Sequence, residues 1–242
     1  MNLVIINQPK TFSPQAEHPM DLEIINQPRV FPRQAGYQIA KRVMDVGLCL
    51  LALPLALPLM IICAVVIYID SPGPVFFVQE RIGKGGRLFR MYKFRTMQPK
   101  FDDSLHRAFM KAFVNGQAVN ENGKRVYKPI QPSQVTSFGR ILRKTSLDEL
   151  PQLINVLKGE MSLVGPRPNV PWEVAEYQSW HYRRLEVLPG MTGLAQVRGR
   201  SCVSFDDIVR YDIEYLEKQS LIMDIKILWW TVRSVVDGKG AG

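Results

Sequence analysis

The residues from Val46 to Ile69 form a run of 24 without a charged side chain. A helix of that length is long enough to cross the hydrocarbon core of a bilayer. Pro54 and Pro58 lie within it, and each removes a backbone amide from the helical hydrogen-bond pattern, so a kink or break is expected. The arms on either side would be about 12 and 16 Å long, each about half of a bilayer. We therefore expect a re-entrant membrane helix over residues 37–70, folded as a helix-break-helix hairpin.

Basic residues flank both ends of this run. Lys41 and Arg42 precede it, and a basic cluster that begins at Arg81 follows it. Because Lys and Arg favour the cytoplasmic side of a membrane, both flanks are expected there. Two alternatives stay open on the sequence: a Pro-kinked helix that spans the bilayer, and a core helix of a soluble protein. Asp45 is expected to be an interfacial cap or a partner of Arg42.

The charge balance indicates anionic partners. Lys and Arg outnumber Asp and Glu by 31 to 22, for a formal net charge of +9. Nucleic acid, nucleotide phosphates and an acidic membrane face all fit that charge. The cysteines Cys49, Cys63 and Cys202 show no C-x-x-C spacing, and two of them lie in the apolar run. Neither a disulfide framework nor a zinc site is therefore indicated.

Residues 1–36 are expected to form a polar, Pro-containing tail without the features of a signal peptide. Residues 5–9 are repeated at 24–28, and two copies are too few for a solenoid. A duplication in a tolerant tail is the simpler interpretation, with a functional peptide as the alternative. Met20 is an alternative start.

Two short apolar runs, at 75–79 and 88–94, predict a β-hairpin across the Gly-rich turn 83–86. Residues 101–114 predict a helix, and 116–130 a surface excursion. The hairpin region is strongly basic, which suits lipid headgroups or phosphates, with a solvated basic face as the alternative. Its basic residues are Arg81, Lys84, Arg87, Arg90, Lys93 and Arg95.

An acidic pair, Asp148 and Glu149, lies near the start of another predicted helix. Ser146 and Glu149 have the spacing of a capping box, which is the structural alternative, and Asp148 would also oppose the helix dipole. A helix N-terminus can equally bind an anion, and Arg143 lies just upstream. An aspartate there can attack phosphorus to give an acyl phosphate, which divides one transfer into two steps.

Three later segments add candidate sites. Prolines flank Arg167, and a pinned guanidinium suits phosphate oxygens, although a structural salt bridge is equally open. Residues 189–200 combine three glycines with Arg198 and Arg200 but lack the known phosphate-loop spacings. Residues 221–236, with a tryptophan pair, predict either a helix at a membrane interface or a packed core helix.

Taken in order, these segments resemble the bacterial monotopic phosphoglycosyl transferases, or polyprenyl-phosphate sugar-phosphate transferases. The resemblance runs from about Lys41 to Val236, and its motifs lie at 70–77, 92–97, 145–153, 158–168 and 189–200. It implies an α+β, mainly helical, monotopic membrane protein with small β-hairpins and interfacial amphipathic helices. Residues 71–242 would then form a cytoplasmic catalytic domain at the bacterial inner membrane.

The resemblance also implies the reaction. A sugar 1-phosphate would pass from a UDP-sugar to a polyprenyl phosphate such as undecaprenyl phosphate, with release of UMP, as the first membrane step of glycan or exopolysaccharide assembly. Mg²⁺ would be required, a homodimer is implied, and nucleic acid is excluded as a partner. By resemblance, Asp148 matches the nucleophile and Glu149 its acidic partner, and both are candidate Mg²⁺ ligands.

The remaining assignments follow the same resemblance. Lys93, Arg143 and Arg167 match phosphate-binding positions, and Arg198 and Arg200 match a nucleotide-side loop. Asp212 matches a recurring acidic position, where a structural role is equally open. The sequence departs from the family at Pro58, which follows Leu57 instead of the common serine.

Two other functions stay open. In a single-step transferase, Asp148 would only hold the metal, and the lipid phosphate would attack the sugar nucleotide directly. In a non-catalytic membrane protein, the basic hairpin would bind nucleotide or lipid. The identity of the sugar cannot be predicted from the sequence.

Overall fold

The computed structural model describes residues 35–98, 104–116, 134–199 and 203–237. Several sequence expectations lie outside these residues: almost all of the N-terminal tail with its repeat and Met20, most of the surface excursion, Arg200 and Cys202.

The described chain is mainly helical with two small two-stranded sheets, which confirms the expected fold class at that level. The elements, with η for 3-10 helices, are α2 (Ala35–Asp70), β1 (Phe76–Ile82), η1 (Lys84–Gly86), β2 (Leu88–Phe94), α3 (Ser104–Val114), α4 (Ser137–Thr145), η3 (Leu147–Glu149), α5 (Gln152–Lys158), β3 (Ser162–Val164), α6 (Pro171–Val174), η4 (Ser179–Glu186), β4 (Gly190–Thr192), α7 (Leu194–Arg198), α8 (Phe205–Glu217) and α9 (Leu221–Val236).

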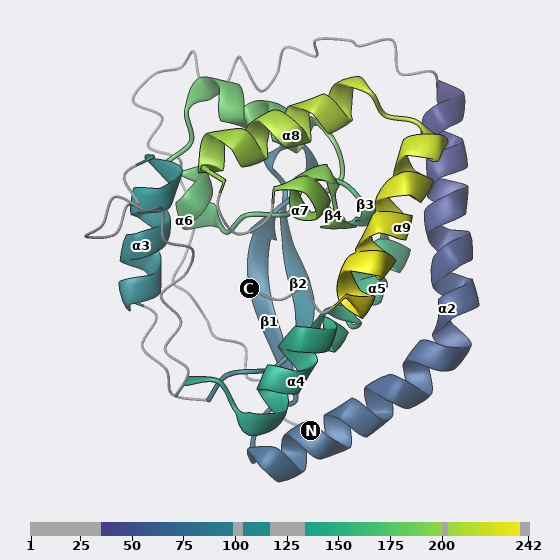
Figure 1. Cartoon of the computed structure of the whole chain (residues 1–242), viewed down its shortest axis with the longest axis vertical. Helices are drawn as coiled ribbons and strands as arrows, with labels where there is room; N and C mark the ends of the chain where they lie inside the picture. Colours follow the sequence, from purple (N-terminus) through teal and green to yellow (C-terminus); the bar gives the residue numbers. More distant parts are fainter. Residues whose placement is uncertain (1–34, 99–103, 117–133, 200–202, 238–242) are drawn as a thin grey trace.

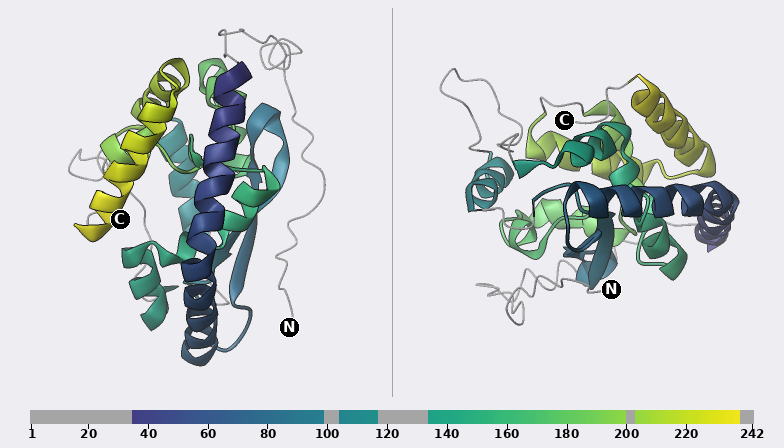
Figure 2. Two further views of the ribbon diagram at one scale, coloured as in Figure 1. Left: turned by 90° about the vertical axis from the view of Figure 1, so that its right-hand side faces the viewer. Right: turned by 90° about the horizontal axis from the view of Figure 1, so that it is seen from below.

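Helix α2 is the longest of these elements and follows one side of the molecule along its long axis (Figures 1 and 2). It continues through Pro54 and Pro58 and is bent partway along its length (Figure 1). The two prolines lie four residues apart, on one face, so the hydrogen bonds that they remove open the same side of the helix. Both prolines are exposed, whereas Ala56 between them is buried. The expected break is therefore a bend in a continuous helix.

Most of the α2 surface is apolar and exposed. Within the described residues, α2 is the one helix long and apolar enough to cross a bilayer, and only 17% of its most apolar window is buried. A buried core helix of a soluble protein is therefore wrong for this segment. A narrow stripe does face the body, and it consists of Cys49, Ala56, Cys63 and Ile67.

The predicted β-hairpin is confirmed. Strands β1 and β2 pair antiparallel, with Phe76 opposite Phe94 and Ile82 opposite Leu88. Strand β1 extends three residues beyond the predicted end at Gln79. The connecting turn places Gly85 at a φ of 66°, a conformation that glycine adopts without a steric penalty.

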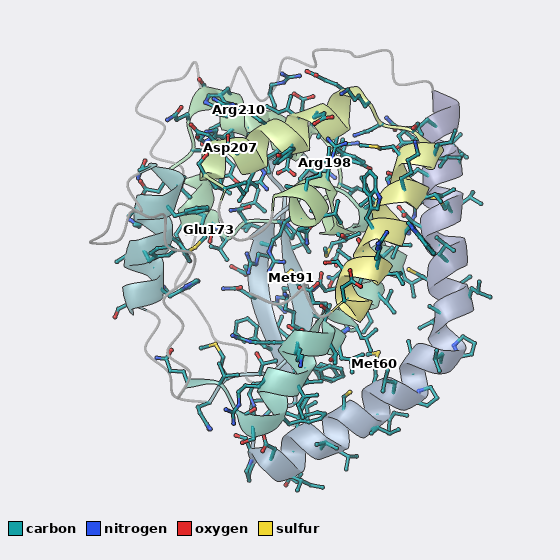
Figure 3. All side chains as sticks on the ribbon, in the orientation of Figure 1. Met60, Met91, Glu173, Arg198, Asp207 and Arg210 are labelled. Carbon is teal, nitrogen blue, oxygen red and sulfur yellow. The ribbon has the colours of Figure 1, made fainter. Side chains whose placement is uncertain are left out.

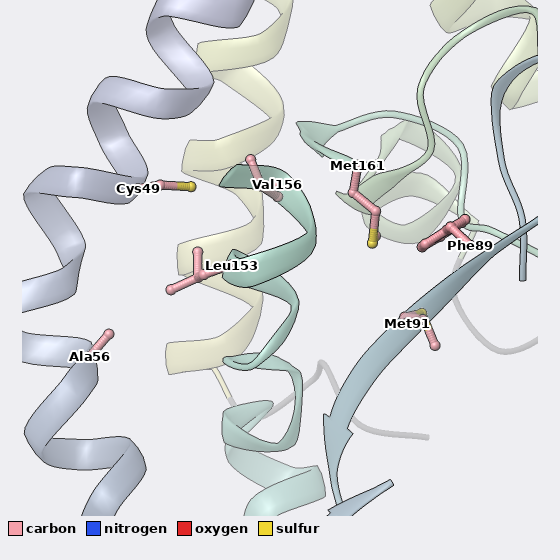
Figure 4. Close-up of a cluster of buried hydrophobic side chains, with 7 residues drawn as sticks. All are labelled: Cys49, Ala56, Phe89, Met91, Leu153, Val156 and Met161. Atoms are coloured by element: carbon pink, nitrogen blue, oxygen red, sulfur yellow. The ribbon is translucent and has the colours of Figure 1, made fainter. Parts of the chain in front are cut away.

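A hydrophobic cluster joins α2, α5 and β2 (Figure 4). Helix α5 lies between the other two elements, so its side chains pack on both sides (Figure 4). Large buried apolar side chains each contribute about 1.5–3 kcal/mol, so this layer fixes α5 and the preceding turn η3 against β2. The cluster consists of Cys49, Ala56, Phe89, Met91, Leu153, Val156 and Met161.

Polar contacts tie the N-terminal arm of α2 to the same body. Arg42 donates to the carbonyls of Val156 and Leu157 at 2.6 and 2.9 Å, at the end of α5. Asp45 accepts from Ser162 Oγ at 2.7 Å and from the Leu163 amide at 3.2 Å. The expected pairing of Asp45 with Arg42 is therefore wrong, because each side chain binds other partners.

The C-terminal end of α2 is also attached to the body. The Asp70 carboxylate accepts a 3.0 Å hydrogen bond from the amide of Phe138 in α4. Just beyond the helix, the Ser71 carbonyl accepts a hydrogen bond from the buried Arg95 guanidinium. Both ends of α2 therefore contact the part of the described chain that follows the helix, α5 near its N-terminal end and α4 at its C-terminal end.

Helix α9 packs beside α2 and has two unlike faces (Figure 1). Ile227 and Asp224 are fully buried, whereas Ile222, Ile225 and Trp229 are more than half exposed. The packed-core interpretation of residues 221–236 therefore accounts for one face only. The exposed apolar face remains consistent with a membrane interface.

Candidate active site

The acidic pair lies in a short 3-10 turn between two helices. Helix α4 ends at Thr145, and Ser146 adopts a left-handed conformation with φ 57°, the one positive φ at a non-glycine among the described residues. The turn η3 then carries Asp148 and Glu149 before α5 begins at Gln152. The predicted start of an α-helix at Ser146 is therefore wrong, because Ser146 is the N-cap of the 3-10 turn η3 and α5 begins only at Gln152. Anion binding at the start of η3 stays a prediction.

The capping-box alternative is also wrong. The Ser146 side chain makes no capping hydrogen bond, because this residue ends α4 instead of starting the next α-helix. The Glu149 carboxylate instead turns toward the β-hairpin. It accepts a 2.7 Å hydrogen bond from Lys93 Nζ on β2, and Arg167 Nη1 lies 3.5 Å from the same oxygen. The structure thus brings together three of the predicted site residues.

Two cations keep Glu149 ionised. Burial acts to raise its pKa, but the charges of Lys93 and Arg167 outweigh burial and lower the pKa to about 2. The side chains of Glu149 and Lys93 are 23% and 13% exposed, so water screens this pair only in part. The negative charge of Glu149 is therefore already offset by Lys93 and Arg167.

Asp148 lies in a different environment. Burial raises its pKa, and so does the neighbouring Glu149, while Lys93, Arg143 and Arg167 act in the opposite direction. Among the described residues, no hydrogen bond or ion pair engages its carboxylate. Adjacent carboxylates with pKa values moved apart are typical of sites that give each a separate task. Asp148 is thus the carboxylate that is available for a ligand or a reaction.

Arg143 is held beside this pair from the preceding helix. Its Nε donates a 2.9 Å hydrogen bond to Thr96 Oγ1, just after β2, and its charge acts on Asp148. The sequence motifs that carry Lys93, Arg143 and Arg167 therefore converge on one acidic turn. Three cations beside two carboxylates in a partly buried site suit the binding of a phosphate-rich ligand.

The structure places Arg198 differently. Its guanidinium lies 3.1 Å from the Glu214 carboxylate on α8 and 5.9 Å from the centre of the Trp230 ring (Figure 3). Among the described residues, none of the contacts of Arg198 reaches the acidic turn. Its role in binding the nucleotide stays a prediction, as does that of Arg200.

Asp212 is buried and forms an ion pair with Arg184 at 2.7 Å. Burial raises the pKa of Asp212 to about 6, while the charge of Arg184 acts to lower it. This contact agrees with the structural role left open for Asp212.

The acidic turn has a limited capacity for a metal ion. The described residues contain no group of three or more His, Cys, Asp or Glu side chains that would hold one. Mg²⁺ commonly takes one or two carboxylates and completes its shell with water and substrate phosphates. Asp148 fits that pattern, whereas Glu149 is already bound to two cations.

The sequence did not point to several residues that build the site. Asn155 is fully buried, accepts from the Tyr92 amide at 3.1 Å and donates to the Arg90 carbonyl at 2.7 Å, which joins α5 to β2 next to Lys93. Asparagine inside a helix is a weak signal on its own. Arg184 is one of two adjacent arginines, and such a pair does not indicate a buried residue in the sequence.

The basic hairpin divides into two sets. Arg81, Lys93 and Arg95 are directed into the body, where Arg81 donates to the Pro168 carbonyl at 3.0 Å. Lys84, Arg87 and Arg90 are exposed. The basic residues of the hairpin therefore contribute both to the interior of the protein, including the candidate site, and to its exposed surface.

The sequence profile described as bacterial sugar transferase matches residues 36–238. The chain belongs to the bacterial sugar transferase family. The match includes the acidic turn, the hairpin and the whole of α9.

Three curated proteins are similar to this bacterial sugar transferase. The exopolysaccharide production protein ExoY of Rhizobium meliloti is 39% identical over 84% of this chain and 88% of its own length. The undecaprenyl-phosphate galactose phosphotransferase of Salmonella typhimurium is 40% identical over 83% of this chain and 41% of its own. The UDP-N-acetylgalactosamine-undecaprenyl-phosphate N-acetylgalactosaminephosphotransferase of Aeromonas hydrophila is 38% identical over 85% and 45%. The chain thus spans less than half the length of the last two.

Proposed function

We propose that this bacterial sugar transferase moves a sugar 1-phosphate from a UDP-sugar to a polyprenyl phosphate, with undecaprenyl phosphate as the natural acceptor. The observation that carries the proposal is an unengaged carboxylate, Asp148, beside a carboxylate held by Lys93 and Arg167. The names of the Salmonella and Aeromonas relatives support the lipid acceptor, and the Aeromonas name supports a UDP-linked donor.

In the first step, an Asp148 oxygen attacks the phosphorus that bears the sugar. A bond forms between this oxygen and phosphorus, and the bond from phosphorus to the bridging oxygen breaks, so UMP leaves with the bonding electrons. The product on the protein is a sugar-phosphoryl aspartate. Lys93, Arg143 and Arg167 offset the charge of the diphosphate, which otherwise repels an anionic nucleophile.

In the second step, an oxygen of the polyprenyl phosphate attacks the same phosphorus. The acyl phosphate bond breaks, the Asp148 carboxylate is regenerated and the product is a polyprenyl-diphosphate sugar. Glu149 remains ionised throughout, since its pKa is about 2. Its task in this scheme is to hold Lys93 and Arg167 at the position where the phosphoryl group binds.

We extend the proposal to Mg²⁺ as a cofactor. Asp148 would hold the ion together with phosphate oxygens of the donor, while Glu149 keeps its two cationic partners. When bound, Mg²⁺ would supply positive charge that offsets the negative charge of the phosphates.

The membrane placement is part of the proposal. Helix α2 would enter the cytoplasmic leaflet of the bacterial inner membrane and return to the same side, and residues 71–242 would form the catalytic domain on that face. The contacts at the two ends of α2 support this topology, because Arg42 binds α5 and Asp70 binds α4, which both lie in the proposed catalytic domain. A helix that crossed the bilayer would separate them. The exposed apolar face of α9 would then lie at the interface, beside the headgroups.

A panel of UDP-sugars tests the proposal. The purified full chain is incubated with undecaprenyl phosphate, Mg²⁺ and each UDP-sugar in turn, and UMP is measured. We expect metal-dependent UMP release with one donor or a few. Since the named relatives use different sugars, the panel also identifies the donor. Absence of UMP release with every donor would favour a non-catalytic nucleotide- or lipid-binding protein.

A further inference from the structure

The loop that presents Arg167 has an unusually restrained backbone. Prolines at 166 and 168 fix two φ angles, and the four consecutive carbonyls of residues 166–169 each accept a hydrogen bond. The donors are the Gly190 amide at 2.9 Å, Arg184 Nη2 at 3.1 Å, Arg81 Nη1 at 3.0 Å and the Ile82 amide at 2.9 Å. With its backbone held in this way, the loop directs the Arg167 side chain to Glu149.

Arg184 supplies the central restraint. Its Nη2 donates to the Arg167 carbonyl, while its Nη1 binds Asn169 Oδ1 at 2.9 Å and the Tyr177 hydroxyl at 3.0 Å. The side chain is 3% exposed. A planar guanidinium can serve several acceptors in fixed directions, which an ammonium group cannot do.

Asp212 forms an ion pair with the same nitrogen of Arg184 that donates to the Arg167 carbonyl. It lies on α8, is 1% exposed and is 2.7 Å from Arg184 Nη2. Burying two charges costs several kcal/mol for each ion, and well-packed apolar residues often give equal or greater stability. An ion pair in this place is therefore better explained by the orientation that it imposes than by the stability that it adds.

The contacts form a continuous path from α8 to the acidic turn. Asp212 binds Arg184, Arg184 binds the backbone of Arg167, and the Arg167 side chain reaches Glu149. We propose that Arg184 and Asp212 are positioning residues, which act on the transfer reaction solely through the placement of Arg167. This inference rests on the proposed function and adds to it two residues that contact neither Asp148 nor Glu149.

Comparison of single and double variants distinguishes residues that position Arg167 from residues that act on the substrate directly. Arg167→Gln is expected to lower kcat/KM for UMP release by about 100-fold, since it removes a donor to the transferred phosphate. Asp212→Asn and Arg184→Lys are each expected to lower it by up to about 100-fold, because displacement of a charged group by an ångström can cost that much. If both act through Arg167, then either change combined with Arg167→Gln matches Arg167→Gln alone within about twofold.

The matched control is Asp206→Asn. Asp206 also lies on α8, and its carboxylate lies 3.2 Å from Nε2 of a buried residue, His181, but it does not contact the loop. We expect this variant to keep its kcat/KM. A multiplicative loss in the double variants would overturn the proposal, since it would mean that Asp212 acts on substrate or metal independently of Arg167.

Hydrogen exchange supplies a measurement that does not require turnover. Asp212→Asn and Arg184→Lys are expected to speed amide exchange in the peptide that covers residues 163–170, at a temperature where all variants remain folded, whereas Asp206→Asn leaves it unchanged. Unchanged exchange in the first two variants would contradict the positioning role. If the wild-type chain released no UMP from any donor, the proposed function would fail, and this exchange measurement would still decide whether the pair orders the loop.

Discussion

Lys93 Nζ lies 2.7 Å from Glu149 Oε1, and this ion pair joins strand β2 to the turn that carries Asp148. The pair forms because α5 packs between α2 and β2, which brings η3 against the strand (Figure 4). It also gives the two adjacent carboxylates different electrostatic surroundings.

Glu149→Gln is expected to move the acid limb of the pH–rate profile to lower pH. The charge of Glu149 raises the pKa of Asp148, and the proposed nucleophile must be ionised, so activity is lost as the pH falls through that pKa. Removal of the charge lowers the pKa. The measurement is kcat/KM for UMP release from pH 4 upward, and a limb displaced to higher pH would contradict this account.

Lys93→Met is expected to have the opposite effect. Lys93 lowers the pKa of Asp148, so its removal raises that pKa and moves the acid limb to higher pH. The same change leaves the partly buried Glu149 with one cation fewer, which should cost about 1–3 kcal/mol of unfolding free energy. The two variants serve as controls for each other, since general damage would not displace the limbs in opposite directions.

Ser146→Gly is expected to raise the thermal stability of the chain, because the left-handed conformation costs a non-glycine residue about 1–2 kcal/mol. Each kcal/mol corresponds to about 2–4 °C in Tm for a chain of this size. Lys144→Gly is the matched control. Lys144 lies inside α4, where glycine costs about 1 kcal/mol, so its Tm should fall. Equal decreases in both variants would show that the backbone at Ser146 is unstrained.

Labelling of single cysteines tests the path of α2. In a chain with Cys49, Cys63 and Cys202 changed to alanine, Gln38→Cys and Glu80→Cys place exposed thiols on either side of the apolar run. A membrane-impermeant maleimide should label both from the same side in inverted vesicles, and neither in right-side-out vesicles. Labelling of the two thiols from opposite sides would establish a spanning helix.

Much of the architecture could be predicted because the signals were local. Two short apolar runs on either side of a Gly-rich turn predicted the hairpin, and the length and composition of the apolar run predicted α2. The bend was less predictable. Two prolines in sequence indicate lost hydrogen bonds, but their position on one exposed face of a helix packed on the body decides between a bend and a break.

The site shows the limits of local spacing. The S-x-x-E pattern at Ser146 predicted a cap, but the left-handed Ser146 ends α4, and Lys93 binds Glu149 from 56 positions away. Arg184 and Asp212 are 28 positions apart and meet only because α8 packs against η4. Neither the pair nor its contact with the Arg167 backbone leaves a pattern in the sequence.

The central claim is that Asp148 becomes covalently bound to the sugar phosphate as a sugar-phosphoryl aspartate. The most direct measurement incubates the full chain with its UDP-sugar and Mg²⁺ in the absence of lipid, followed by intact-mass and peptide analysis. The account predicts a burst of one UMP per chain and a mass gain of one sugar phosphate on the peptide that contains Asp148, with neither in Asp148→Asn. UMP release that occurs only in the presence of lipid, with no adduct on the chain, would contradict the covalent mechanism. Turnover retained by Asp148→Asn would contradict it as well.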